Sequence, residues 1–552
     1  MDRFFRALNG CPQGRSGIKC EFDMPAAFFI YKPANCRLES FIKLKMLKRL
    51  FLFYFLAFPF ALFAQKPNWQ NMDLQRDSVF GISTEKAYTE LLKGKTPVPV
   101  IVAVIDAGVD TNHEDLKAIL WHNLKPKAFD NGSYGWSYIG SAKGNVHFDN
   151  LEVTRQVRQY MAGDTNRLSG SDLMTYHAEK RDWQKQKNEA DNMVRGITGF
   201  ENVLNGVTQK MAKDNPTLAD FKAYQPQGAA EQHIVQVMIS LLSKEDDFAK
   251  IKKDQIDDAI EHFKEQADYQ LNLNYDPRSI VGDDYFNSKQ RNYGSPDVNG
   301  PDPTHGTHVS GIIAAVRNNG IGINGVADDV QIMAIRAVPS GDERDKDIAN
   351  AIRYAADHGA KVINMSFGKP YSQDKKAVDE AVKYALKKDV LLVQAAGNSN
   401  EDIDTAANFP NRIYANGKEA GAWIVVGASG WKNDTTLKAP FSNYGKTAVD
   451  VFAPGVQIYS SIPGSKYAYF DGTSMASPVV AGLAALIREY YPKLTAMQVK
   501  EIIMASVVKV DHPVNEQIGN NTLRVPFSEL CITGGIVNAY GALELAEKTD
   551  PL

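Results

Sequence analysis

The stretch HGTHVSG places two histidines, His305 and His308, three residues apart, so that on a helix they lie on the same face. Such a pair can ligate a metal, pack as ordinary helix side chains, or supply a catalytic base. The metal interpretation needs further ligands at suitable spacing, and the sequence has neither HExxH nor a third His or Cys nearby. The partners that the rest of the chain supplies therefore decide between these readings.

A serine and an aspartate elsewhere in the chain suit a histidine base. Ser474, in DGTSMASPVVAGLAALI, opens a predicted apolar helix, whose first N–H groups and dipole favour a developing oxyanion. Serine is a poor nucleophile near neutral pH, so it needs a neighbouring base, and the base needs an orienting acid. Asp106 ends the apolar run VAVID and offers that acid. Asp, His and Ser thus occur in an order compatible with acyl transfer.

Alternating strands and helices must bring these residues together. The run VPVIVAVID is nearly all apolar, which is typical of a buried parallel strand. Amphipathic helices are predicted in DIANAIRYAADHGA and AVDEAVKYALKKD. This alternation predicts an α/β fold with a doubly wound, mostly parallel sheet, helices on both faces and a site at the carboxyl ends of the strands. Further strands are expected at QIMAIRAV, KVINMSFG, VLLVQAAGN and WIVVGAS.

Residues 150–275 break this alternation. The segment is rich in Gln, Lys, Asp and Glu, has apolar residues at helical spacing, and contains a capping-box pattern at Thr217. We expect a helical insertion of roughly 120 residues, long enough to be a small domain. It leaves and rejoins the chain between Asp106 and His305, which predicts a place near the cleft. A gate that admits small peptides and a peripheral partner-binding arm both stay open.

The sequence MLKRLFLFYFLAFPFALFAQ, which starts at Met46, has the layout of a secretory signal peptide over 46–64. Its apolar run of about 14 residues is shorter than the roughly 20 that span a bilayer, although an uncleaved anchor is the alternative. Residues 1–45 then form an upstream segment, and we expect Met46 to be the true start. Cleavage near Ala64 predicts an exported protein, periplasmic or extracellular, without membrane attachment.

Composition excludes some classes of function. The 552 residues include 62 basic and 65 acidic side chains, without a basic stripe, so no nucleic-acid partner is expected. Three of the four cysteines precede Met46, and only Cys531 follows Ala64, so the mature chain is predicted to form no internal disulfide. Nothing in the composition indicates an oligomeric state.

The segments around Asp106, His305 and Ser474 closely resemble the signature motifs of subtilisin-like serine peptidases (subtilases). The resemblance covers about 95–149 and 276–545, which predicts a peptidase domain over 98–149 and 276–548 after a short segment, 65–97. It implies a secreted serine endopeptidase that hydrolyses peptide bonds in polypeptides through an Asp–His–Ser triad and an acyl-enzyme. His305 is then the base and His308 structural. A catalytically inactive subtilisin fold, binding partners through the insertion, is the alternative.

The resemblance also implies roles for residues around the triad. Asn398, in QAAGNSN, matches the side-chain oxyanion donor, with a plain turn residue as the alternative. In NMSFG the backbone is expected to pair with substrate, and Phe367 either faces the pockets or packs in the core. The residues involved are Ser366, Phe367 and Gly368 for substrate pairing, and Ala395, Ala396 and Gly397 for one wall of the primary specificity pocket.

Two departures from the family pattern stand out. Ala107 follows the catalytic Asp, where Ser or Thr is frequent, which removes a hydrogen bond to the carboxylate. The segment 65–97 is also too short for an ordinary inhibitory pro-domain. No cofactor is expected for the chemistry, but a structural calcium at Asp115 and Asn319 fits the family, with a simple Asn-Gly turn as the alternative.

Overall fold

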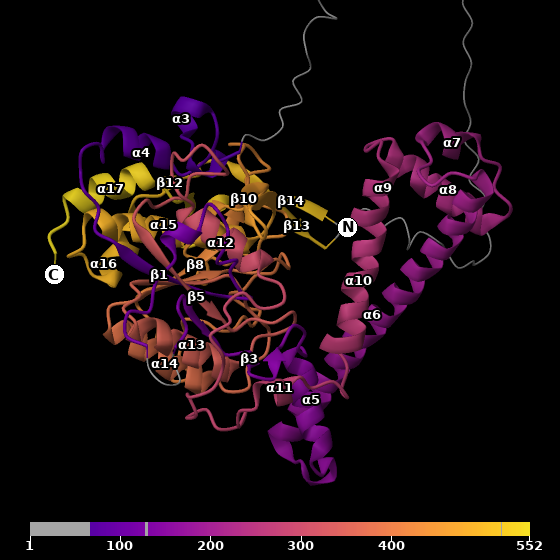
Figure 1. Ribbon diagram of the computed structural model, residues 1–552, viewed down its shortest axis with the longest axis horizontal. Coiled ribbons are helices and arrows are strands. Elements are labelled where there is room, and N and C mark those ends of the chain that lie inside the picture. Colours follow the sequence, from indigo (N-terminus) through magenta and orange to yellow (C-terminus); the bar gives the residue numbers. More distant parts are fainter. Residues whose placement is uncertain (1–66, 127–130, 520, 552) are drawn as a thin grey trace, which may run out of the picture. The chain divides into compact units, whose positions relative to one another are not determined.

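The computed structural model describes residues 67–126, 131–519 and 521–551, and the predicted signal and upstream segments lie outside them. The chain from Pro67 onward forms one compact unit. Its centre is a nine-stranded sheet with the order β12-β15-β9-β8-β7-β6-β1-β5-β2 (Figure 1). Its strands are β1 (Val100–Asp106), β2 (Gly135–Ser137), β5 (Val330–Arg336), β6 (Val362–Met365), β7 (Leu391–Ala395), β8 (Trp423–Ser429), β9 (Val451–Pro454), β12 (Val508–Lys509) and β15 (Gly535–Ile536).

All neighbouring strands in this sheet are parallel except β12 and β15. Strand β1 lies between β5 and β6, so the order of strands reverses there, and Asp106 stands opposite Arg336 in register. In doubly wound sheets, ligands bind beyond the carboxyl ends of strands at such a switch point. The predicted fold class is confirmed, and Asp106 lies at this point.

Helices cover both faces of the sheet (Figure 1). Val102 and Val104 of β1 belong to one core cluster, whereas Ala103 and Ile105 belong to the other. This division explains why the strand is apolar along its whole length. One face carries α4 (Thr84–Glu90), α12 (Thr304–Ala314), α15 (Thr473–Tyr490), α16 (Ala496–Ala505) and α17 (Ala539–Glu547), and the other α13 (Asp345–Asp357) and α14 (Lys375–Lys387).

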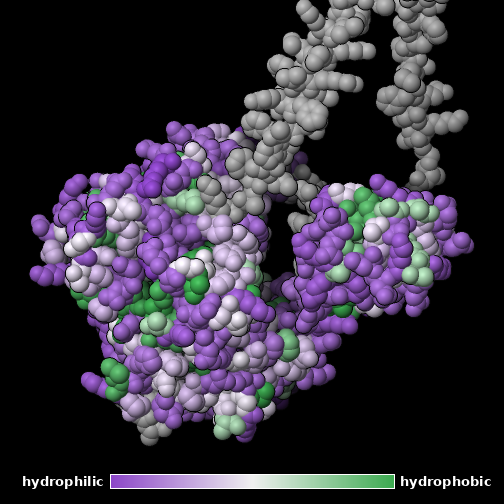
Figure 2. All heavy atoms as spheres, turned by 45° about the horizontal axis from the view of Figure 1, so that its top comes forward, coloured by the Kyte–Doolittle hydropathy of each residue, from purple (hydrophilic) through white to green (hydrophobic). Residues whose placement is uncertain are grey.

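Among the described residues, the segment between β4 (Gly144–Asn145) and α12 contains helices and no strand. The long helix α6 pairs with the returning α10, and Trp183 donates its indole N–H to the carbonyl of Leu271 at 3.1 Å. On the face that Figure 2 shows, the surface of this helical segment is largely hydrophilic. Its elements are α5 (Glu152–Ala162), η3 (Thr165–Arg167), α6 (Gly170–Met211), α7 (Leu218–Ala223), α8 (Ala229–Leu242), α9 (Phe248–Ile251), η4 (Lys252–Asp257), α10 (Asp258–Glu265), η5 (Gln266–Gln270) and α11 (Arg278–Val281).

The capping box predicted at Thr217 is confirmed, because Thr217 and Asp220 bond each other's backbone N–H at the start of α7. Among the described residues, no helix is long and apolar enough to cross a membrane. The short segment before β1 packs into the core through the buried Trp69, which donates to the carbonyl of Val456 at 3.1 Å. Smaller elements are η1 (Trp69–Asn71), α3 (Leu74–Asp77), η2 (Lys117–Ile119), β3 (Gly140–Ser141), β10 (Ile458–Ile462), β11 (Lys466–Phe470), β13 (Pro513–Ile518), β14 (Asn521–Pro526) and η6 (Phe527–Glu529).

Candidate active site

Asp106 and His305 meet where β1 ends and α12 begins. The Nδ1 atom of His305 lies 2.8 Å from Oδ1 of Asp106, so a hydrogen bond joins the imidazole to the carboxylate. The next residue, Gly306, allows this approach, because a Cβ there would lie only 2.1 Å from the carbonyl oxygen of Gly108. The small residue after His305 is therefore needed for the helix to reach the end of the strand.

Asp106 is buried and incompletely hydrogen-bonded. Its Oδ1 also accepts the N–H of Ala107 at 2.8 Å, whereas its buried Oδ2 has no partner among the described residues. The methyl group of Ala107 offers no donor to that oxygen. Burial opposes a charge on His305, but the charge and hydrogen bond of Asp106, aided by Asp302, outweigh it and raise the pKa of His305.

His308 makes different contacts from His305. Its Nε2 lies 3.1 Å from the carbonyl oxygens of both Ile458 and Ala468. Its ring stacks on Phe470, with 4.3 Å between the ring centroids. Burial lowers its pKa to about 3, so the ring is neutral near pH 7. His308 therefore fastens α12 to the β10–β11 hairpin.

Ser474 is the second residue of α15 and is tied to the segment after β6. Its hydroxyl donates to the carbonyl of Ser366 at 3.1 Å, and the Ser366 hydroxyl donates to the carbonyl of Ser474 at 2.9 Å. In the part of the chain that the structure describes, no hydrogen bond joins Ser474 to His305. Catalytic hydrogen bonds are often loose without substrate.

Asn398 follows β7, after Gly397 with φ of +105°, a conformation that favours glycine. Thr473 donates both its backbone N–H and its hydroxyl to Oδ1 of Asn398, each at 2.9 Å. This leaves the Nδ2 group to donate elsewhere. A Cβ added to Gly472 would lie 3.5 Å from the backbone N of Ser474 and 3.6 Å from Nδ2 of Asn398, so both donors border one point.

A pocket of about 280 Å³ opens beside His305. Phe367 lines it and is only half-buried, while its ring also packs against the core, so its role toward substrate stays a prediction. Gly368 is exposed, and Ala395 and Ala396 are buried near Asn398, outside this pocket. Its lining consists of Asp106, Ala107, His147, Asp302, His305, Arg336, Val338, Pro339, Ser340, Ser366 and Phe367.

Several of these lining residues were not predicted from the sequence. Val338 and Ser340 follow β5, the neighbour of β1, so the switch-point rule offers a signal for them. Arg336 is buried, donates its Nε–H to the carbonyl of Ala107 at 2.8 Å, and has a pKa lowered to about 10, chiefly by burial. His147 stands just before the insertion, where no sequence pattern marks it.

Asp115 and Asn319 lie together, as the calcium prediction requires. However, Nδ2 of Asn319 donates to Oδ1 of Asp115 at 2.6 Å, and the hydroxyl of Tyr467 lies 3.4 Å from Oδ2. Hydrogen-bond donors, rather than the six to eight oxygens that Ca²⁺ prefers, thus surround this buried carboxylate. Within the described residues, no group of three or more His, Cys, Asp or Glu side chains is arranged to hold a metal. The arrangement does not fit calcium as it stands, and calcium stays a prediction.

Comparison with known proteins places the chain in a family. The family model described as "Subtilase family" matches residues 99–521, and the chain belongs to that family. It is 45% identical over 213 residues to the "Thermophilic serine proteinase" of Bacillus sp. (strain AK1), and the matched region covers 38% of this chain and 47% of the relative.

The chain is also 45% identical over 184 residues to "Thermitase" of Thermoactinomyces vulgaris, covering 33% of this chain and 60% of that protein. It thus spans about half the length of these two curated relatives. A solved structure titled as proteases from Pseudoalteromonas arctica is 20% identical, with a TM-score of 0.46, and the match covers 87% of this chain and 100% of that one.

Proposed function

We propose that this chain is a serine endopeptidase that hydrolyses peptide bonds in polypeptides. The observation that carries the proposal is the 2.8 Å hydrogen bond between His305 and Asp106, in a chain of the subtilase family that places Ser474 at the start of α15. Family membership and this pairing together favour catalysis over the inactive scaffold. We also propose that the protein is exported after cleavage near Ala64.

The mechanism follows from these positions. On substrate binding, the Ser474 hydroxyl leaves the Ser366 carbonyl, passes its proton to Nε2 of His305, and its oxygen bonds to the scissile carbonyl carbon. Asp106 holds Nδ1–H and stabilises the imidazolium. The carbonyl oxygen becomes an oxyanion, which we propose is bound by Nδ2 of Asn398 and the N–H of Ser474.

Breakdown of the tetrahedral intermediate completes the first half of the reaction. The C–N bond breaks as His305 gives its proton to the leaving amine, which leaves an acyl-enzyme on Ser474. Water then attacks the ester carbonyl and gives a proton to His305. The bond between the acyl carbon and Oγ of Ser474 breaks as His305 returns that proton to Oγ, and the acid product leaves. Every proton moves through His305, so no cofactor is needed for this sequence.

Active-site labelling tests the proposal directly. The purified full chain is treated with a fluorescent fluorophosphonate, which bonds to activated serines, and is assayed in parallel on casein. We expect labelling and cleavage by the wild type and neither by Ser474→Ala, with turnover lowered on the order of 10⁶-fold and thermal unfolding unchanged. The exposed Ser399 provides the matched control, because Ser399→Ala should label normally.

The outcomes separate the candidate functions. A folded wild type that neither labels nor cleaves casein supports the inactive scaffold and refutes the proposal. Labelling that a chelator abolishes, and that calcium restores, supports the calcium prediction. Casein cleavage that survives Ser474→Ala excludes Ser474 as the nucleophile.

A further inference from the structure

The pocket beside His305 has a wall that touches the helical insertion. His147 lines the pocket, and its ring stacks on Phe148 with 4.1 Å between the ring centroids. Phe148 in turn stacks on Tyr269 of η5, with 4.3 Å between the ring centroids and 4° between the ring planes. Ser340, on the same wall, donates its hydroxyl to the carboxylate of Glu265, at the end of α10. His147 thus contacts Tyr269 of the insertion through an aromatic stack that includes Phe148, and Ser340 contacts Glu265 through a charge-assisted hydrogen bond.

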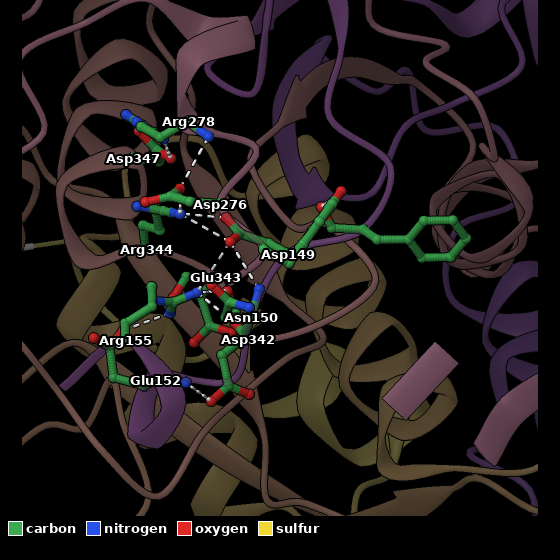
Figure 3. A network of polar contacts seen from close by, with 12 residues as sticks. Asp149, Asn150, Glu152, Arg155, Asp276, Arg278, Asp342, Glu343, Arg344 and Asp347 are labelled. Carbon is green, nitrogen blue, oxygen red and sulfur yellow. Dashed lines mark hydrogen bonds and ion pairs between the residues drawn. The ribbon is translucent and has the colours of Figure 1, made fainter. Parts of the chain in front are cut away.

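A buried ion network anchors the two ends of the insertion (Figure 3). At the entry, Asp149 accepts from Arg344 at 2.7 and 2.8 Å, and Glu152 accepts from Arg155 at 2.5 Å. At the exit, Arg278 donates to Asp347 at 2.6 and 2.8 Å. Both ends are therefore bound to the same core segment, 342–347, by side chains that are almost wholly buried.

The same network lies close in sequence to two stretches of the pocket lining. The segment 342–347 follows Val338 and Ser340. Lys369 follows the lining residue Phe367 by two positions, and its fully buried side chain pairs with Glu152 and Asp345 at 2.9 Å each. The base of the insertion is therefore tightly packed against the segments that carry the pocket residues. Because well-packed contacts transmit displacement, a shift of the insertion base is expected to move the pocket wall.

We propose that the base of the insertion determines substrate specificity, because Tyr269 and Glu265 set the position of the His147–Ser340 pocket wall. This rests on the proposed peptidase function. The pocket takes one substrate side chain, the one that lies beside His305 when the peptide runs along Ser366–Gly368. Tyr269 and Glu265 touch no reacting atom and are positioning residues. The distal helices α7, α8 and α9 are not needed for this effect.

The test compares substrates that do and do not reach the pocket. Two chromogenic tetrapeptides differ only in the second residue on the N-terminal side of the scissile bond, which is Ala in one and Phe in the other. A single-residue N-acetyl ester serves as the minimal substrate. We expect Tyr269→Leu to change the Ala-to-Phe ratio of kcat/KM about fivefold, mainly through KM. Ester hydrolysis should stay within about twofold of wild type, because the ester leaves the pocket empty.

Two matched variants sharpen this test. Tyr269→Phe keeps the ring stack and should retain the wild-type ratio. Replacing 202–251 by a short Gly/Ser linker should also retain it; this excision removes α7, α8 and α9 and joins Glu201 to Lys252, whose side chains are already paired at 3.3 Å. Glu265→Ala, which removes the acceptor of Ser340, should shift the ratio in the same way as Tyr269→Leu.

The other outcomes either overturn this inference or point to the proposed function. An unchanged ratio in folded Tyr269→Leu or Glu265→Ala overturns it, as does an equal loss on ester and peptides, which marks a general structural role. If the Ala-to-Phe ratio of kcat/KM changes when 202–251 is excised, specificity belongs to the distal helices α7, α8 and α9 instead. Failure of the wild type to hydrolyse the ester points to the proposed function itself, which separates the two failures. If Tyr269→Leu does not fold, Glu265→Ala alone decides.

Discussion

The catalytic centre and the ion network at the base of the insertion both hold charges near the cleft, but in opposite ways. His305 keeps 40% of its side chain exposed beside a buried Asp106, and one oxygen of that carboxylate lacks a partner. In the network, Lys369 and Glu152 have no exposed side-chain surface and are paired with each other. One region is open and the other is closed, although Glu152 in the network, like Asp106, also has one buried oxygen, Oε1, without a partner among the described residues.

This difference follows from what each region does. A catalytic base must exchange protons with substrate and solvent, so it cannot be sealed by strong partners. The network has no such need, and Arg155 and Lys369 keep Glu152 ionised within it, whereas burial raises the pKa of Glu343 to about 8. Burial alone would raise the pKa of Glu152, but Arg155 and Lys369 outweigh it and lower the pKa to about 2. The network charges therefore serve position and the triad charges serve chemistry.

The largest effect on stability is expected from breaking the network at Lys369. Lys369→Met leaves Glu152 with Arg155 as its cation but removes the cation that pairs with the buried Asp345, and an uncompensated buried charge costs about 3–5 kcal/mol. We expect the free energy of unfolding to fall by this amount in urea denaturation. The matched control is Lys446→Met, because the Lys446–Glu529 pair is more than half exposed and its loss should cost below about 1 kcal/mol. Equal effects of the two variants would contradict this view of the network.

The two regions also differ in how well the sequence predicts them. The sheet follows from apolar runs such as VAVID, and Asp106, His305 and Ser474 stand in contiguous motifs. The network residues are scattered over 149–155, 276–283, 342–347 and 369, and no local pattern links them. In the sequence, GDERDKD looks like a solvated loop, but the structure buries most of it where the ends of the insertion meet. Burial of this kind depends on distant chain segments, which periodicity does not detect.

A second prediction removes an interaction from the catalytic centre without touching the network. Asn398→Ala deletes the Nδ2 donor, and we expect kcat to fall about 10²- to 10³-fold with KM little changed, because that donor acts on the developing oxyanion. Thr473 loses the acceptor of its N–H and hydroxyl groups, so we expect the free energy of unfolding to fall by about 1–3 kcal/mol, while the folded variant still shows the loss of kcat. Thr473→Val, which removes only one of the two bonds that orient Asn398, should cost less. A loss carried by KM would assign Asn398 to ground-state binding instead.

The smallest effect is expected from an exposed charge next to the triad. His305 must be neutral to accept the proton of Ser474, so kcat/KM should rise with pH through the pKa of His305, which lies above its usual 6.5. Asp302 favours the charged imidazole, so Asp302→Asn should lower this pKa and move the acid limb of the profile to lower pH, but only slightly because solvent screens the exposed carboxylate. The substitution keeps an oxygen for the N–H of Thr304, which Asp302 accepts at 3.0 Å. Salt at 1 M should shrink the shift, and Asp511→Asn, beyond the edge strand β12, should produce none. An acid limb that moves to higher pH in Asp302→Asn would show that the charge of Asp302 does not act on His305 in this way.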